Sequence, residues 1–167
     1  IPNKNVFNIG GNWDFRLHSI LSHLLGLQGF FSFFSTKRML KRLDKIKPDV
    51  VHLRVLHSNC VNLPLLLKYL AKRGIATVIT LHDCWFFTGH CCYFIDSNCD
   101  KWRNKCGNCP DLKNWNRSWF FDNTQYILKT KKELFEQINN LTVVGVSDWV
   151  TCFIPHSILK DAKCIKR

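Results

Sequence analysis

The apolar positions in the first third of the chain have helical spacing. Residues 16–28 carry apolar side chains at intervals of three and four, which predicts a helix. Residues 36–47 predict a second helix, with apolar side chains on one face and basic side chains on the other. Pro48 ends this segment, because proline lacks the backbone N–H that a helix requires. The apolar positions are Leu17, Ile20, Leu21, Leu24 and Leu25 in the first helix and Met39, Leu40, Leu43 and Ile46 in the second.

After Pro48 the pattern changes to short apolar runs separated by a helix. Residues 49–53 and 75–81 are apolar runs that predict buried strands. Between them, residues 62–73 predict a helix, since Asn62 can cap its start and Gly74 follows its end. A strand, a helix and a strand at this spacing form a βαβ unit, in which the two strands are parallel.

The second half of the chain begins with a long irregular segment. Residues 84–118 are rich in Cys, Trp, Asn and Gly, and a loop of this length is unusual without an organiser of its own. Residues 122–139 predict a helix and residues 141–146 a third strand, after which Ser147 can cap a short helix through Phe153. We therefore expect an α/β fold, a Rossmann-like parallel sheet with flanking helices that carries a Cys-rich insertion at 84–118.

The composition is typical of a globular protein, and the chain carries a strong positive charge. Hydrophobic residues make up 46% and charged residues 22%, which suits a chain with a real core. The formal net charge of +12 favours an anionic partner, such as nucleic acid, acidic lipid or a phosphorylated ligand, although a basic surface without a partner is equally compatible. The sequence carries no secretory signal and no apolar run long enough to span a membrane, so we expect a cytoplasmic protein.

Polar side chains follow the two predicted strands of the βαβ unit. His82 and Asp83 come directly after the second strand, where a histidine can exchange a proton or bind a sugar hydroxyl and an aspartate can orient it. His52 lies within the first, apolar strand and is expected to be a core histidine, whereas Arg54, His57 and Asn59 follow this strand. Ligands of open α/β sheets bind beyond the carboxyl ends of the strands, so these residues are candidates for one site. The alternative is structural: His82 ends the strand, and Asp83 caps the turn that follows.

Five of the nine cysteines form a cluster in the insertion, from Cys91 to Cys109. Disulfides are not expected in a chain without a secretory signal, so the cluster indicates metal binding. The pair Cys106-x2-Cys109 places two thiolates on one tight turn, as tetrahedral zinc prefers, and Cys91 and Cys99 complete a set of four. Cys92 can replace Cys91 and His90 can compete, and a set of ordinary buried thiols is the alternative.

Several strings, in this order and spacing, resemble one family of enzymes. Residues 80–91, TLHDCWFFTGHC, resemble the TLHD-x-W-x-FTG-x-C motif of bacterial family-4 type glycosyltransferases, which act in capsule, exopolysaccharide and colanic acid synthesis. The resemblance runs from about His18 to the C-terminus. Other matching strings are KPDVVHL at 47–53, NLP at 62–64, CDKW at 99–102, CGNCP at 106–110, DNT at 122–124 and SDW at 147–149.

The resemblance implies the GT-B fold, with two Rossmann-like domains facing each other across a cleft. It implies a nucleotide-sugar donor, a glycan or lipid-linked acceptor and retention of the anomeric configuration. It places His82 in the cleft facing the sugar. Asp83 remains the second catalytic candidate, and Thr88, Gly89 and His90, which the cysteine loop would hold beside His82, are candidate substrate-binding residues. On this basis we expect residues 1–167 to be an incomplete N-terminal, acceptor-side domain without the C-terminal donor-binding domain. Arg54-Val55 depart from the His-Asn that the family tends to show there.

Two other functions are compatible with the sequence. The first is a zinc-stabilised basic module that binds nucleic acid, although the basic residues lie mainly on helix faces and not beside the cysteines, which makes nucleic acid the weaker expectation. The second is an inactive remnant of a glycosyltransferase. The run Phe30–Phe34, next to the basic helix, also offers a peripheral contact with acidic membrane at its inner face, and packing of these rings in the core is the alternative that the sequence favours slightly.

Overall fold

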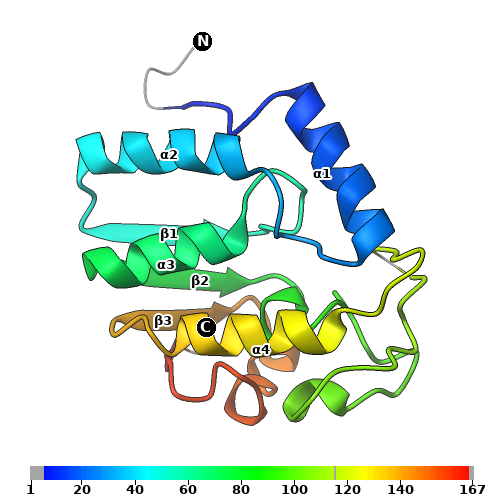
Figure 1. Ribbon diagram of the computed structural model, residues 1–167. Helices are drawn as coiled ribbons and strands as arrows, with labels where there is room; N and C mark the ends of the chain where they lie inside the picture. The colour runs from blue at the N-terminus through cyan, green and yellow to red at the C-terminus, as the bar shows by residue number, and fades with distance from the viewer. Residues whose placement is uncertain (1–5, 115, 166–167) are drawn as a thin grey trace.

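A sheet of four parallel strands forms the centre of the protein. The computed structural model describes residues 6–114 and 116–165. The strands follow each other in chain order, as β1 (Val50–Arg54), β2 (Ala76–Leu81), β3 (Leu141–Gly145) and β4 (Lys163–Ile165) (Figure 1). The three expected strands and their parallel direction are confirmed. The fourth strand was not expected, because its three residues are all exposed and form no apolar run.

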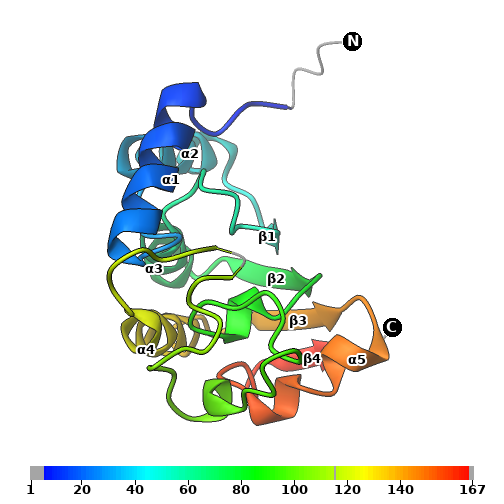
Figure 2. The same cartoon turned by 90° about the vertical axis from the view of Figure 1, so that its right-hand side faces the viewer.

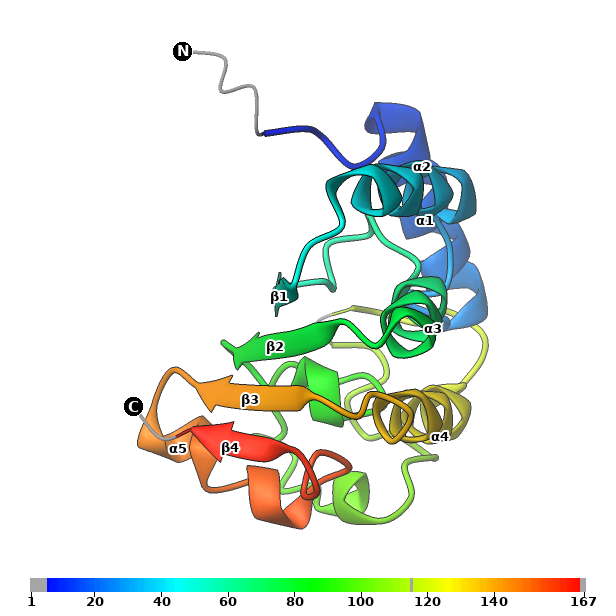
Figure 3. The ribbon, with the colours of Figure 1, turned by 90° about the vertical axis from the view of Figure 1, so that its left-hand side faces the viewer.

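The predicted βαβ unit is present, and its helix covers one face of the sheet. Helix α3 (Leu63–Arg73) begins where the Asn62 side chain accepts a hydrogen bond from the Leu65 amide at 3.0 Å. It ends at Gly74, whose φ of 64° is in the left-handed region that favours glycine. Helix α4 (Thr124–Phe135) lies beside α3 on the same side of the sheet (Figure 3). The side chains between these helices and the strands are fully buried and include Leu67, Leu70, Ile79, Ile127 and Val143.

Helix α1 (Asn12–Leu25) turns most of its apolar positions toward solvent. Trp13, Leu17 and Ile20 are 82%, 59% and 51% exposed, whereas the buried residues of the helix are His18 and Ser22. The periodicity therefore predicted the helix correctly, but the apolar face is not its packing face. The helix starts at Asn12, four residues earlier than the apolar spacing alone indicates.

Helix α2 (Phe33–Ile46) has the expected division into an apolar and a basic face. Met39 is buried, while the six lysines and arginines of residues 37–47 are all exposed. The helix packs beside α3, and Asp44 joins the two by accepting hydrogen bonds from Tyr69 and Arg73 at 2.8 and 2.6 Å. Figure 1 shows α1 and α2 on the β1 side of the molecule.

The Cys-rich insertion lies at the carboxyl ends of the strands, and aromatic side chains form its core. Apart from residue 115, which is not described, it contains two short 3₁₀ turns, Trp85–Phe87 and Lys101–Arg103, and is otherwise irregular, as expected (Figure 2). Trp102 is 4.9 Å from Phe94 and 5.3 Å from Phe87 between ring centroids, and Phe153 completes the cluster. The insertion has few aliphatic residues, but these rings supply the apolar burial that the segment requires.

The end of the described chain returns to the sheet through two short turns. Ser147 caps α5 (Asp148–Thr151) by accepting a hydrogen bond from the Val150 amide at 3.4 Å. The predicted helix was expected to reach Phe153 but ends at Thr151, and a 3₁₀ turn at Ile154–His156 follows. Pro155 in that turn has no backbone N–H to continue an α-helix.

Candidate functional site

The ends of β1 and β2 bring two candidate residues into contact. The strands pair in parallel with Arg54 opposite Thr80, so Arg54 at the end of β1 and His82 just after β2 lie at the same edge of the sheet. The Arg54 guanidinium donates to Nε2 of His82 from Nε at 3.2 Å and from Nη2 at 3.1 Å. Because arginine only donates, Nε2 of His82 is the acceptor and the imidazole is neutral in this arrangement. The pair is partly open to solvent and combines a fixed cation with a polar ring.

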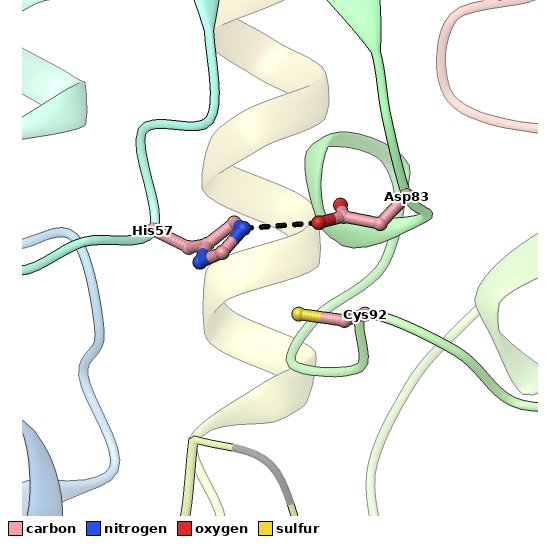
Figure 4. Close-up of side chains that lie close together, drawn as sticks. All are labelled: His57, Asp83 and Cys92. Atoms are coloured by element: carbon pink, nitrogen blue, oxygen red, sulfur yellow. Dashed lines mark hydrogen bonds and ion pairs between the residues drawn. The ribbon is translucent and has the colours of Figure 1, made fainter. Parts of the chain in front are cut away.

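His57 and Asp83 form a second pair beside the first. His57 Nε2 lies 2.9 Å from Asp83 Oδ2 (Figure 4), and the side chains are 25% and 13% exposed. The other carboxylate oxygen, Oδ1, accepts a hydrogen bond from the Trp85 amide at 2.9 Å. Asp83 therefore caps the first 3₁₀ turn of the insertion, which is the structural role that the sequence left open for it. Its place in catalysis stays a prediction.

A buried network holds this second pair in place. The Gln28 side-chain amide donates to the His57 carbonyl at 2.7 Å, and its oxygen accepts from Trp85 Nε1 at 2.8 Å. The Trp85 ring also meets the His57 ring edge-on, with centroids 5.8 Å apart. Gln28 is 5% exposed and Trp85 1%, so their rotamers are fixed by packing. Gln28 thus connects three segments by hydrogen bonds: the loop before α2, the loop after β1 and the start of the insertion.

Lys131 is a fully buried cation below the site, and the sequence analysis missed it. Its ammonium group donates to the carbonyls of Trp85 and Thr88 at 2.5 and 2.9 Å and lies 3.8 Å from the centroid of the Trp85 ring. Burial lowers the pKa of Lys131 from 10.5 to about 7, because the charged form loses its hydration. The sequence did contain a signal: Lys131 occupies the apolar stripe of α4, three or four residues from its buried neighbours Ile127, Leu128, Leu134 and Phe135.

The other predicted binding residues are more deeply placed in the protein than Arg54 and His82. Thr88 and His90 are 1% and 3% exposed, and the Thr88 hydroxyl donates to the Cys91 carbonyl at 2.6 Å. Gly89 is buried against α4, where a side chain would overlap the Thr124 carbonyl. Asn59 has its side-chain oxygen buried without a partner, in a backbone with φ of 53°. The structure thus joins Arg54 to His82 directly but sets these four residues deeper, and their contact with substrate stays a prediction.

The histidine in the middle of β1 is not a core residue. His52 was expected to be buried in an apolar strand, but its ring is exposed and its Nε2 lies 2.7 Å from the Thr80 hydroxyl on β2. The burial pattern of β1 explains this difference, because Leu53 is the buried residue of the strand and the side chains before and after it point away from the helices.

The cysteines divide into two groups that face different ways. Cys91, Cys99, Cys106 and Cys109 all line one small cavity, with Cys91 Sγ 4.0 Å from Cys109 Sγ. Cys92 instead faces the strand ends. Its sulfur, His57 and Asp83 have ligand atoms within 4.8 Å of one another (Figure 4). Burial raises the pKa of Cys92 to about 12, so this thiol is protonated in the structure as it stands. The sequence did not place Cys92 beside Asp83.

A more voluminous hollow lies elsewhere among the described residues. It has a volume of about 690 Å³ and is lined by the amino ends of the strands, including Val50, Ala76 and Thr142. Ligands of open α/β sheets bind at the opposite, carboxyl ends. The polar pairs at Arg54–His82 and His57–Asp83 mark that end, so we place the candidate site there and not in the larger hollow.

The chain is similar to a protein that is named for sugar transfer. Over 96 residues, 54% of this chain, it is 31% identical to "Putative colanic acid biosynthesis glycosyl transferase WcaC" of Escherichia coli (strain K12). The match covers 23% of that protein, so the chain spans about a quarter of its relative's length. No family model matches the chain. No solved structure matches it either. The chain is thus related over about half its length to a glycosyltransferase-like protein.

Proposed function

We propose that this chain forms the acceptor-side domain of a GT-B glycosyltransferase of surface polysaccharide synthesis. The enzyme would transfer a sugar, with retention, from a nucleotide-sugar to a glycan or lipid-linked acceptor. The observation that carries the proposal is the pairing of Arg54 with His82 at the carboxyl edge of a parallel sheet. The resemblance of residues 80–91 and the similarity to the E. coli protein support the same class.

In this proposal each pair has its own role. Arg54 offers a fixed positive charge with several donors, which suits the phosphate or sugar oxygens of a lipid-linked acceptor. His82 lies against it and hydrogen-bonds a sugar hydroxyl through the ring nitrogen that Arg54 leaves free. His57 and Asp83 keep the strand-to-insertion turn in position below. The nucleotide would be held by a second, donor-binding domain.

Acceptor binding by the 167-residue chain tests the proposal. We expect a lipid-diphosphate-linked sugar in detergent micelles to bind the wild-type chain, and Arg54→Ala to weaken binding about tenfold or more, because a charge-assisted hydrogen bond is lost. The matched control is Arg103→Ala, which removes an exposed arginine in the insertion. Equal loss in both variants, or salt-dependent binding of unrelated DNA with no acceptor binding, would instead favour the basic nucleic-acid module.

The exposed face of α1 supports a peripheral contact of the same enzyme with acidic membrane. Among the described residues, no helix is long and apolar enough to cross a membrane. Trp13, Leu17 and Ile20 recur on one face of α1 and are more than half exposed, and Phe34 at the start of α2 is 77% exposed. The exposed lysines and arginines of α2 supply positive charge nearby. Leu17→Ser should reduce co-sedimentation with anionic vesicles, whereas Ile95→Ser, at an exposed position in the insertion, should not.

A further inference from the structure

Four thiols of the insertion surround one atom-sized cavity. Cys91, Cys99, Cys106 and Cys109 all contribute to its wall, together with apolar groups such as Phe94 and Trp102. Its volume is about 10 Å³, which corresponds to room for a single small particle. Cysteines separated by up to 18 positions in the sequence thus line one small space.

The closest two sulfurs already have the spacing of a tetrahedral metal site. Cys91 Sγ and Cys109 Sγ are 4.0 Å apart. With zinc–sulfur bonds of about 2.3 Å, two ligands of a tetrahedron lie about 3.8 Å from each other. A disulfide would require about 2.05 Å, and all nine cysteines are free thiols.

The other two sulfurs complete the set from irregular segments. Among the described residues, no three of the four sulfurs lie within 4.8 Å of one another, so Cys99 and Cys106 must move inward to share an ion. Both residues lie outside helices and strands and are only partly buried, so a change of rotamer in this irregular segment would bring their sulfurs closer. The close Cys106-x2-Cys109 spacing brings the third ligand to the side of the cavity where Cys109 already stands.

A buried cation beside the cavity has no anionic partner in an ion pair. Lys131 is 1% exposed, and among the described residues its ammonium group forms no ion pair with a carboxylate. It donates to the carbonyl of Thr88, which lies three residues before Cys91 and lines the same cavity. Lysine is almost never fully buried unless it is paired. Four thiolates on Zn²⁺ carry a net charge of −2 and would supply the missing counter-charge.

We propose that Cys91, Cys99, Cys106 and Cys109 bind one structural zinc ion. The cysteine geometry selects Cys91 over the adjacent Cys92, whose sulfur faces His57 and Asp83. Four protein ligands leave no open position for water, so the ion's role is to fix the fold of the insertion and not to act on substrate. The proposal does not depend on glycosyl transfer, since a nucleic-acid module or an inactive remnant with this fold would bind the same ion.

Metal analysis of the 167-residue chain, purified under reducing conditions, tests the site. We expect about one zinc per chain, and loss of that zinc in Cys109→Ser and Cys106→Ser. Cys92→Ser is the matched control, because it removes an adjacent buried thiol outside the site and should keep the metal. Substitution with Co²⁺ should give the intense visible bands and the sulfur-to-metal charge-transfer absorption of a tetrahedral thiolate site.

Two further measurements keep the test decisive if the serine variants do not fold. Cys106→His retains a zinc ligand and should keep the metal that Cys106→Ser loses. Wild-type protein stripped by a chelator should regain its thermal stability on titration with one equivalent of zinc. Metal-free wild-type protein that is equally stable with and without zinc would overturn the proposal. Loss of zinc in Cys92→Ser or His57→Ala would also overturn it, because the ion would then sit at the strand ends.

Discussion

His18 carries a neutral imidazole in the interior of the protein. The Gly29 amide donates to its Nε2 at 3.3 Å, so Nε2 is an acceptor and Nδ1 holds the proton, which it directs to the Ser32 hydroxyl at 2.6 Å. The residue is 1% exposed. Burial lowers the pKa of His18 from 6.5 to about 4, and the nearby Asp14 carboxylate offsets only part of this effect. Protonation would turn the acceptor for Gly29 into a second donor and break this contact.

His18 should therefore make the protein less stable in mild acid. Its folded-state pKa of about 4 is below the unfolded value of 6.5, so the unfolded chain binds more protons between these two values. The contribution of the neutral ring is complete above pH 6.5 and is lost as the pH falls toward 4. At pH 5 the expected loss is about 2 kcal/mol of unfolding free energy relative to pH 7. Urea denaturation at both pH values measures it, and His18→Gln should show a correspondingly smaller difference.

Single residues were predictable only where their neighbours in sequence define their surroundings. His82 and Asp83 follow a recognisable strand, so their position at its end was predictable. The contact between Arg54 and His82 followed from the βαβ topology, but the hydrogen bond itself depends on rotamers that no sequence pattern specifies. Cys92 beside Asp83 depends on the path of an irregular loop and therefore could not be predicted.

At the scale of elements, the insertion is packed directly on α4. Gly89 lies against the start of this helix, where the backbone of Thr124 occupies the space of a side chain. Lys131, two turns further along α4, donates to Trp85 and Thr88 of the insertion. The insertion also reaches α1, because the Trp119 amide, just beyond it, donates to the His23 carbonyl at 2.7 Å. These contacts make the insertion part of the domain's core.

Gly89→Ala should test this packing. The added methyl would overlap the Thr124 carbonyl, and backbone oxygen cannot move aside as a flexible side chain can. We expect the free energy of unfolding to fall by about 3 kcal/mol, as for overpacked cores. Gly11→Ala is the matched control, because nothing lies within 4 Å of the added methyl there. Thermal or urea unfolding of both variants measures the difference. Equal stabilities of Gly89→Ala and Gly11→Ala would show that the insertion can shift to accommodate the methyl group.

The elements themselves were predictable because their boundaries have local physical causes. Asn62 and Gly74 delimit α3, and Ser147 starts α5, each through a cap that the residue type favours. The buried face of α1 was not predictable. The apolar spacing predicts the helix correctly, but the helix packs against the protein through His18 and Ser22. Only the surrounding elements determine which face of such a helix is covered. Strand β4 lacks any apolar run, and its pairing with β3 depends on the sheet already being present.

At the scale of the whole molecule, the candidate site is one-sided. Its polar pairs lie at the carboxyl ends of β1 and β2, and Gln28 and Trp85 of the same domain hold the His57–Asp83 pair. The chain corresponds to 23% of the E. coli glycosyl transferase that it resembles. In the proposed function the acceptor binds at this edge, while a separate domain brings the nucleotide-sugar toward it.

We therefore expect the 167-residue chain by itself not to transfer sugar, even where it binds the acceptor. Holding donor and acceptor in reactive alignment contributes roughly 7–11 kcal/mol to lowering a barrier, and one side of a cleft cannot supply it. Release of nucleotide from a panel of nucleotide-sugars, with lipid-linked acceptor present, measures turnover. A His82→Ala preparation is the matched control, since activity common to both comes from a contaminant. In an enzyme that joins this domain to a donor-binding domain, His82→Ala should lower kcat without changing the unfolding temperature. Turnover by the isolated wild-type chain that disappears in His82→Ala would contradict the two-domain mechanism while confirming His82 in the site.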